Sequence, residues 1–379
     1  MSEPLKRANP VPEGHTPKEV PEIIAMAQQE SQQLRGPAEN VLRGVPRLGY
    51  GDPSPMCYIG SVMRLMDYIG DPVGQSELFA LSGAGLCFPW AYQSGCDEIS
   101  VIPEIPRRTF TALGYESEYF YEPDISGARQ YSKEFYIEKI KNAIDSGRPV
   151  LGFGFTAAAF TCLITGYADH GERLYLRAYW SPENKPEGYD DDETYYCVGD
   201  WYGKCHGVVT VGRKIGERLA GEKAYTHIRE MAAVFSTVTS VPAEGPTIHT
   251  GPAAFDAMIA WLLDDSHWQD KNMPDQGVFL NPCGILLLMY YRNSLHEYLT
   301  KLAKDCPGLV NPSVLSAVER MRPLVPGKQK RDYYLHQAVY RKLRKFSSMR
   351  KRALREKVAA CVAQLKELDR EIYGGLLGI

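Results

Sequence analysis

The sequence has no long hydrophobic run and no strong excess of charge. Its longest apolar stretch, residues 283–291, is too short to span a bilayer, and its first residues lead into polar, proline-rich sequence without the apolar segment of a secretory signal. The 43 basic side chains nearly balance 46 acidic ones, and the net charge of −3 gives no argument for a nucleic-acid or membrane partner. We therefore expect a cytoplasmic protein.

Cysteine and histidine patterns typical of metal sites are also missing. The chain has nine cysteines, an odd number without a compact framework, and no Cys-x-x-Cys or His-x₃-His pair. This argues against a structural zinc site and, in a reducing compartment, against disulfides. An acidic run at 190–193 matches no known metal-binding loop, so it reads as a solvated hairpin tip. We expect neither a metal nor another cofactor.

With 379 residues, the chain is long enough for two domains, and the residue patterns divide it accordingly. Residues 1–40 are polar and proline-rich, and we expect them to form an extension. Residues 41–217 combine amphipathic helices with alternating strands, and residues 218–379 show helical periodicity without strands. We expect helices at 57–70, 75–81, 133–146, 221–239, 252–265, 283–304, 312–321, 331–347 and 350–373, and strands at 149–155, 160–167, 173–180, 194–199 and 206–212. The prediction is an α+β domain with an antiparallel sheet, followed by an all-helical domain.

Cys57 and His206 are the residues most suited to chemistry. Cys57 opens an amphipathic helix, where the helix dipole and unpaired amides lower a thiol pKa. His206 begins an alternating strand and could act as the base that a thiolate nucleophile needs. Papain-like enzymes have this layout. The alternatives are a buried core thiol and a hydrogen-bonded residue at the end of a strand.

Several segments resemble a known group of proteins. Residues 45–90, with CYIGSVMRLMDYIGDPVGQSELFALSGAG, look like the opening of bacterial proteins related to the N-terminal domain of the butirosin-biosynthesis acyltransferase. The stretches 147–180 and 200–214 resemble a largely uncharacterised subgroup of those proteins. The whole group is more distantly similar to the bacteriocin-leader cysteine peptidases. Segments 250–265 and 366–377 of the helical half are similar as well, to the same subgroup. The resemblance implies a papain-like fold and an acyl-transfer or amide-hydrolysis reaction.

The chain departs from the wider fold at the catalytic positions. The expected histidine, at the start of the strand ending in Thr-Gly-Tyr, is replaced by Phe160, and the acid partner by Ala178. His206 has the same spacing to a glycine one hairpin later, so it could supply the base, with Asp200 orienting it. No glutamine precedes the cysteine, which leaves Tyr50 or Ser54 as candidate donors to an oxyanion.

Aromatic residues flank the elements expected to form the cleft. They suit a pocket for an apolar or aromatic substrate, although packing in the core explains them equally well. The candidate substrate-binding residues are Tyr50, Trp90, Phe160, Trp180 and Trp201.

A basic stretch, RKLRKFSSMRKRALREK at 341–357, stands out in the helical half. A solvated helical face is the simpler interpretation, and an acidic partner such as an acyl-carrier protein is the alternative. The chain could therefore be a cysteine-dependent acyl-transfer enzyme acting on a small-molecule or peptide-like substrate. It could also be an inactive papain-like protein that binds a small molecule or regulates a partner, or an interaction protein that uses this basic helix.

Overall fold

The structure, a computed structural model, describes most of the chain after residue 36. The described residues are 37–49, 53–54, 56–91, 102–122, 128–155, 161–179, 195–237, 240–241, 248–268, 275–322 and 350–379.

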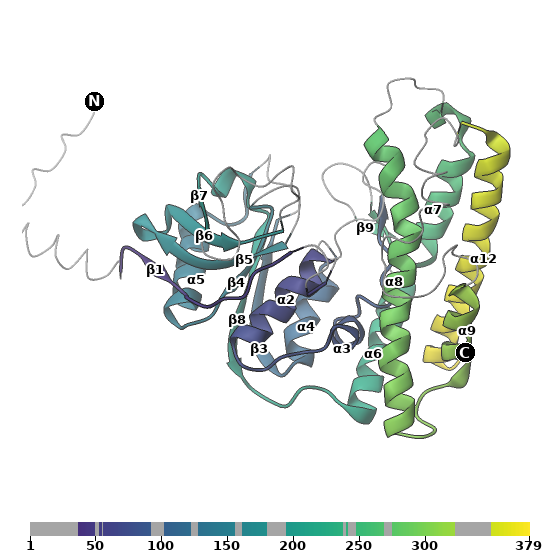
Figure 1. Cartoon of the computed structure of the whole chain (residues 1–379), viewed down its shortest axis with the longest axis horizontal. Helices are drawn as coiled ribbons and strands as arrows, with labels where there is room; N and C mark the ends of the chain where they lie inside the picture. Colours follow the sequence, from purple (N-terminus) through teal and green to yellow (C-terminus); the bar gives the residue numbers. More distant parts are fainter. Residues whose placement is uncertain are drawn as a thin grey trace, which may run out of the picture.

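An antiparallel sheet forms the centre of the first half (Figure 1). Its strands run in the order β3-β8-β4-β5-β6-β7, and β1 pairs with the last part of β5 on the side away from β6. The bounds are β1 Asn40–Val41, β3 Tyr115–Tyr121, β4 Val150–Phe153, β5 Thr161–Ala168, β6 Arg173–Arg177, β7 Tyr196–Gly199 and β8 Gly207–Lys214. All eight residues of β5 are buried. An α+β fold with an antiparallel sheet is thus confirmed.

Strand β3 lies at one edge of this sheet, and the sequence analysis missed it. Its residues alternate between the two faces, as a strand requires. Phe120 packs against Phe135 with ring centroids 4.9 Å apart, whereas Tyr119 and Tyr121 both contact Phe153 on the opposite face. The alternating tyrosines of YESEYFY are the signal that could have predicted this strand.

Helices cover both faces of the sheet (Figure 1). Helix α5 (Lys133–Asp145) lies on the face that carries Phe120, and its first turn is capped by the Ser132 hydroxyl, which accepts from the amide of Phe135. Helices α2 (Cys57–Tyr68) and α4 (Glu104–Ala112) cover the other face. There the guanidinium of Arg107 lies 5.7 Å from the ring centre of Tyr119.

The second half is mainly helical, as predicted. Its helices are α6 Gly221–Thr237, α7 Gly251–Leu263, α8 Asp275–Asp305, α9 Pro312–Met321 and α12 Arg352–Leu377. The prediction that strands are absent after residue 217 is wrong. β9 (Ser240–Val241) and β10 (Ile248–His249) form a small sheet in which β10 also pairs with β2 (Trp90–Ala91). The helix predicted at 331–347 lies outside the described residues. No helix in the described ranges is long and apolar enough to cross a membrane.

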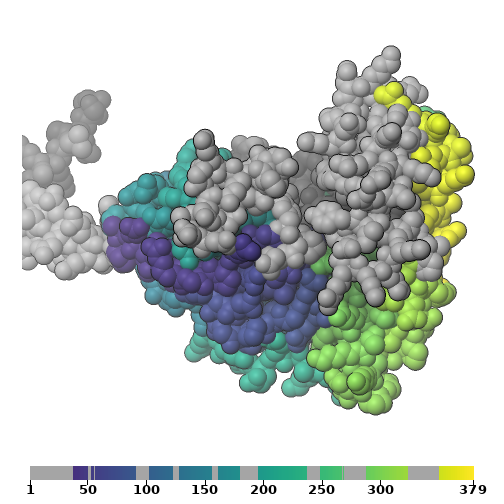
Figure 2. All heavy atoms as spheres, viewed as in Figure 1, coloured from purple at the N-terminus to yellow at the C-terminus, as the bar shows by residue number. Residues whose placement is uncertain are grey.

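Helix α3 (Gln75–Leu81) and the segment after it join the two halves. The ring of Phe79 lies 5.5 Å from that of Tyr290 on α8, and Phe88 lies 4.8 Å from Phe255 on α7. In Figure 2 the blue surface of residues in this part of the chain abuts the green surface of the helical half. Residues 75–88, which belong to the predicted first domain, therefore pack against helices of the second.

A buried ion pair strengthens this junction. Arg292 of α8 donates from Nε to Asp369 of α12 at 2.6 Å and from a terminal nitrogen to the carbonyl of Gly85 at 2.6 Å. Both charged side chains are almost fully buried, and the Tyr373 hydroxyl donates to the carbonyl of Leu86 at 2.8 Å. These contacts tie the segment after α3 to α8 and α12.

Candidate functional site

Cys57 is the first residue of α2, as the sequence analysis predicted. Met56 precedes it in an extended conformation, and the Met56 side chain does not cap the helix. The first helical amides therefore keep the partial positive charge that favours a thiolate. Cys57 itself is 4% exposed, so a substrate would have to reach the thiol in a nearly enclosed position.

The residues before Cys57 are held by both halves of the chain. The Ser54 hydroxyl accepts from the amide of Met56 at 3.2 Å and forms a hydrogen bond with Tyr290 of α8. The neighbouring Tyr291 hydroxyl donates to the Met56 sulfur at 3.7 Å, and the Tyr179 hydroxyl to the carbonyl of Ser54 at 3.4 Å. Burial raises the pKa of Tyr290 to about 12, so this side chain stays a neutral hydroxyl.

These contacts bear on the predicted oxyanion donors. The Ser54 hydroxyl already serves the Met56 amide and Tyr290, and it is fully buried. It is therefore poorly placed to turn toward a substrate. Tyr50, the other candidate, lies outside the described residues.

Contacts on two sides of α2 show which face meets the sheet. A Cβ built on Gly60 would lie 1.7 Å from the hydroxyl of Tyr179, which follows β6, so this side faces the end of β6. On the other side, the Tyr58 hydroxyl donates to Thr109 of α4 at 2.8 Å. Side chains one residue apart on a helix differ by about 100°. Cys57 and Ser61 project between these two directions, toward β5, on which α2 packs.

His206 stands immediately before β8, and its main chain is held on both sides. Its amide donates to the carbonyl of Phe153 at 2.9 Å, and its carbonyl accepts from the amide of Glu122 at 2.7 Å. The ring nitrogen Nδ1 lies 3.2 Å from the Glu122 carbonyl oxygen. Because a carbonyl oxygen only accepts, Nδ1 carries the proton, and Nε2 keeps the lone pair that a general base needs. Burial lowers the pKa of His206, which favours this neutral form.

A buried carboxylate fixes the segment that orients His206. Glu122, 4% exposed, accepts from Nε of Arg129 at 3.1 Å and from the Tyr136 hydroxyl at 2.9 Å. Arg129 also donates to the carbonyls of Tyr202 at 3.0 Å and Cys205 at 2.6 Å. The network thus binds the end of β3 to the turn before β8, and it sets the position of the imidazole. Sequence reasoning missed both Glu122 and Arg129.

The register of the sheet relates His206 to the start of β5, the strand on which the helix of Cys57 packs. Phe153 at the end of β4 pairs with Thr161 at the start of β5 and with Gly207 at the start of β8. Strands β5 and β8 therefore begin at the same end of the sheet, the end at which β4 between them finishes. At a strand spacing of about 4.8 Å, the two starts lie about 10 Å apart. His206 therefore precedes a strand that begins at the same level as Thr161, but two strands away.

Asp200 does not orient His206 as predicted. It is exposed, in the turn after β7, with a left-handed φ of 47°. The contact with Nδ1 is instead made by the main-chain carbonyl of Glu122. A main-chain acceptor next to a neighbouring strand leaves no pattern in the sequence, whereas a nearby carboxylate such as Asp200 does.

Trp201 and Trp90, two of the predicted substrate-binding residues, are buried in the core. Trp201 is fully buried, donates from Nε1 to the carbonyl of Gly171 at 3.0 Å and lies 5.7 Å from the ring of Phe155. Trp90 is 1% exposed and lies 6.2 Å from Trp261 of α7. Ala178 is described and buried, whereas Tyr50, Phe160 and Trp180 lie outside the described residues.

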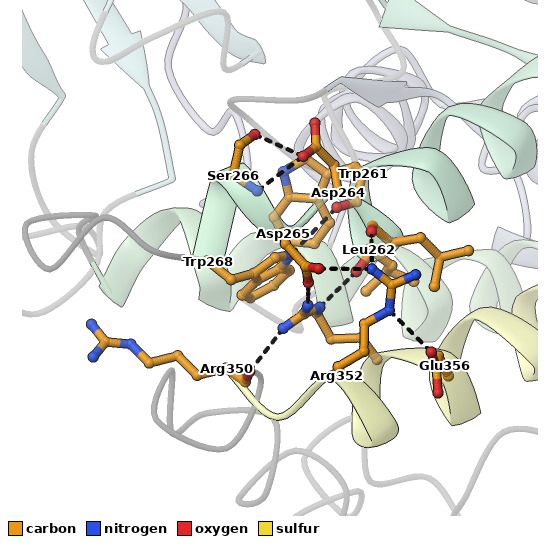
Figure 3. A network of polar contacts seen from close by, with 11 residues as sticks. Trp261, Leu262, Asp264, Asp265, Ser266, Trp268, Arg350, Arg352 and Glu356 are labelled. Atoms are coloured by element: carbon orange, nitrogen blue, oxygen red, sulfur yellow. Dashed lines mark hydrogen bonds and ion pairs between the residues drawn. The ribbon is translucent and has the colours of Figure 1, made fainter.

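The described end of the basic stretch has a structural role (Figure 3). Arg352 donates to the carbonyl of Leu263 at 2.7 Å and to Asp265 at 3.0 Å. Arg355, 1% exposed, donates to the carbonyl of Leu262 at 2.8 Å and pairs with Asp265. Two arginines of the stretch thus satisfy the last carbonyls of α7, a normal role for arginine at a helix C-terminus. Residues 341–349 lie outside the described part.

A separate pocket lies on α6. It has a volume of about 450 Å³, is lined by residues of α6 and the residue Leu219 before it, and shares no residue with the Cys57 site. No group of three or more metal-ligating side chains is found among the described residues. Comparisons with known protein families, curated proteins and solved structures found no match for this chain.

Proposed function

We propose that the chain is a cysteine-dependent acyl-transfer enzyme, with Cys57 as nucleophile and His206 as base. One observation carries the proposal: Cys57 opens a helix that packs on β5, and β5 begins at the same end of the sheet as β8, the strand that follows His206. There Nδ1 of His206 donates a hydrogen bond to the carbonyl of Glu122, and this leaves Nε2 as a proton acceptor.

In this reaction His206 takes the proton of the Cys57 thiol, and the thiolate sulfur attacks the carbonyl carbon of an acyl donor. The C–S bond forms as the leaving group departs with the proton from His206. An amine or water then attacks the thioester and regenerates the thiol, which yields an amide or an acid. The mechanism requires the two side chains to bridge the width of β4, directly or through the substrate.

A second candidate is a papain-like protein without catalysis that binds a small molecule or regulates a partner. The separation of β5 from β8 by a whole strand favours it, as does Ala178 at the position of the acid partner. In that case Cys57→Ala leaves ligand affinity and biological activity intact. In the enzyme, the same substitution abolishes turnover.

The test is the rate of alkylation of each cysteine by iodoacetamide between pH 5.5 and 9, with the sites mapped by mass spectrometry. The chain provides internal controls, because burial raises the pKa of the Cys205 thiol to about 12 and that of the Cys162 thiol further. These thiols should stay inert at neutral pH. Cys197 is exposed but also has a raised pKa, so it should react only in alkaline solution.

A Cys57 that reacts fast below neutral pH, and is slowed by His206→Ala, supports the catalytic pair. Asp200→Ala is the matched control and should change nothing, because Asp200 is exposed and the Glu122 carbonyl holds Nδ1. A Cys57 that is inert or titrates as an ordinary thiol would overturn the enzyme proposal in favour of the second candidate. An acidic carrier protein remains a proposed partner, to be tested by charge reversal within 341–351, which leaves Arg352 and Arg355 intact.

A further inference from the structure

Two buried hydroxyl groups, one on α2 and one on the strand β5 beneath it, have no hydrogen-bond partner among the described residues. They are Oγ of Ser61 on α2, 0% exposed, and Oγ1 of Thr161 at the start of β5, 1% exposed. Leaving a buried hydroxyl unpaired costs about 1–3 kcal/mol, and most buried polar side chains in proteins are paired. A pair of such groups on facing elements therefore points to a ligand that supplies the missing partner.

Ser61 lies on the same face of α2 as Cys57, one helical turn further along. Side chains on a helix lean toward its N-terminus, so the Ser61 hydroxyl leans toward the turn that carries the thiol. A serine inside a helix commonly donates to the carbonyl four residues before it, and Ser61 does not. Its proton is thus available for another acceptor at the sheet-facing side of α2.

Thr161 faces the same side of the sheet as α2. It pairs directly with Phe153, and paired residues of antiparallel strands project from the same face. Phe153 contacts Tyr119, which lies under Arg107 of α4, the helix beside α2. The next residue of β5, Cys162, projects toward the opposite face, where it is fully buried.

The N-terminal turns of α2 and the start of β5 meet at one level of the sheet. Helix α2 packs on β5, and the backbone of Gly60 lies against the hydroxyl of Tyr179, which follows the end of β6 where that strand runs beside the start of β5. Cys57, Ser61 and Thr161 therefore line one seam between α2 and β5. Two hydroxyl donors beside a thiol suit a carbonyl oxygen, which can accept two hydrogen bonds.

We infer that Ser61 and Thr161 donate hydrogen bonds to the acyl oxygen of the substrate during attack by Cys57. This inference rests on the proposed acyl transfer. As the sulfur bonds to the carbonyl carbon, the π electron pair moves to the oxygen, which becomes an oxyanion between the two hydroxyls. The pair returns when the leaving group departs with a proton from His206, and the acyl-thioester forms. Ser54 cannot take this role, because its hydroxyl is already bonded to the Met56 amide and Tyr290.

The test compares two reactions of the same thiol. Acylation of Cys57 by p-nitrophenyl acetate passes through an oxyanion, whereas alkylation by iodoacetamide attacks a saturated carbon and does not. Removal of one oxyanion donor in an enzyme typically slows the reaction about 100- to 1000-fold. We expect Thr161→Val and Ser61→Ala each to slow acylation at least about 10-fold, because the second donor remains, and to leave alkylation unchanged.

Thr165→Val is the matched control on the same strand. Thr165 is fully buried, but its hydroxyl donates to the carbonyl of Tyr175 at 3.1 Å. This variant should lower the melting temperature and leave both rates at Cys57 unchanged. Thr161→Val and Ser61→Ala should not lower the melting temperature, because they remove hydroxyls that have no partner in the unliganded protein.

The outcomes separate this inference from the proposed function. Wild-type protein that is alkylated and acylated at Cys57, with Thr161→Val and Ser61→Ala acylated at the same rate, overturns this inference alone. Wild-type protein that is not acylated at Cys57 overturns the proposed function and the inference together. Equal slowing of acylation and alkylation in both variants shows a distorted thiol site and also contradicts the inference.

Discussion

The backbone of Gly60 lies directly against the hydroxyl of Tyr179. A Cβ built on Gly60 would come 1.7 Å from the phenolic oxygen and 3.1 Å from the ring carbon that bears it. Glycine is therefore required at this turn of α2 by the close approach of another side chain and not by its backbone conformation. The contact also sets how near the N-terminus of α2 can lie to the sheet.

Gly60→Ala should destabilise the protein, although a glycine-to-alanine change inside a helix normally stabilises by about 0.5–1 kcal/mol. The added methyl group must displace Tyr179 or shift α2, and overpacking of this kind costs about 1–3 kcal/mol. Urea denaturation of the variant measures the effect. Tyr179→Phe combined with Gly60→Ala should recover part of the loss, since it removes the nearest atom. A single variant as stable as wild type contradicts the close approach.

Arg129→Ala should cost about 2–4 kcal/mol of unfolding free energy, because it leaves the buried carboxylate of Glu122 without its cationic partner. The variant also loses the two donors that hold the carbonyls of Tyr202 and Cys205. The double variant Arg129→Ala/Glu122→Gln should be more stable than Arg129→Ala, since it no longer buries an unpaired charge. Chemical denaturation of the four proteins completes the cycle, and strict additivity would argue against the ion pair.

Arg355 and Arg352 provide a matched pair on α12. Both donate to carbonyls at the end of α7 and pair with Asp265, but the side chain of Arg355 is 2% exposed and that of Arg352 is 47% exposed. Arg355→Ala should cost about 2–3 kcal/mol, because it also leaves the buried carbonyl of Leu262 unpaired. Arg352→Ala should cost less than about 1 kcal/mol, as exposed ion pairs do. Melting temperatures that fall equally for both variants would contradict this difference.

Stability should fall when the solution is acidified through the ordinary histidine range. Burial lowers the pKa values of His206, His227 and His296 in the folded protein, so all three stay neutral there while the unfolded chain takes up protons. The unfolded state then binds more protons below about pH 6.5, and the free energy of unfolding decreases from there down to the folded-state pKa values.

Urea midpoints measured between pH 7.5 and pH 5.5 test this dependence. His227→Gln should flatten it, because His227 contributes one of the three protons while its Nε2 contact with the Leu81 carbonyl, 2.8 Å long, can be kept by the glutamine amide. A stability that rises on acidification in this window, or a slope that His227→Gln leaves unchanged, would show that these histidines are not buried as described.

The sequence was sufficient for much of the local structure. The helix that begins at Cys57 has apolar side chains at helical spacing, and β8 has alternating valines and threonine, so both elements follow from hydrophobic periodicity. β3 was missed although its tyrosines alternate, because glutamate and serine between them weaken the apolar signal. The short β9 and β10 have only two residues each, too few for any period to show.

The arrangement of the site depended on tertiary structure. The identity of Cys57 as a helix-opening thiol is local and could be read from the chain. Which group orients His206 is not local, because the main-chain carbonyl of Glu122 reaches it through strand pairing across 84 residues. The place of β4 between β5 and β8 is likewise a property of strand order, which no residue pattern encodes by itself. Sequence alone therefore determined the candidate residues and their secondary structure, and only the packing of distant segments decided their neighbours.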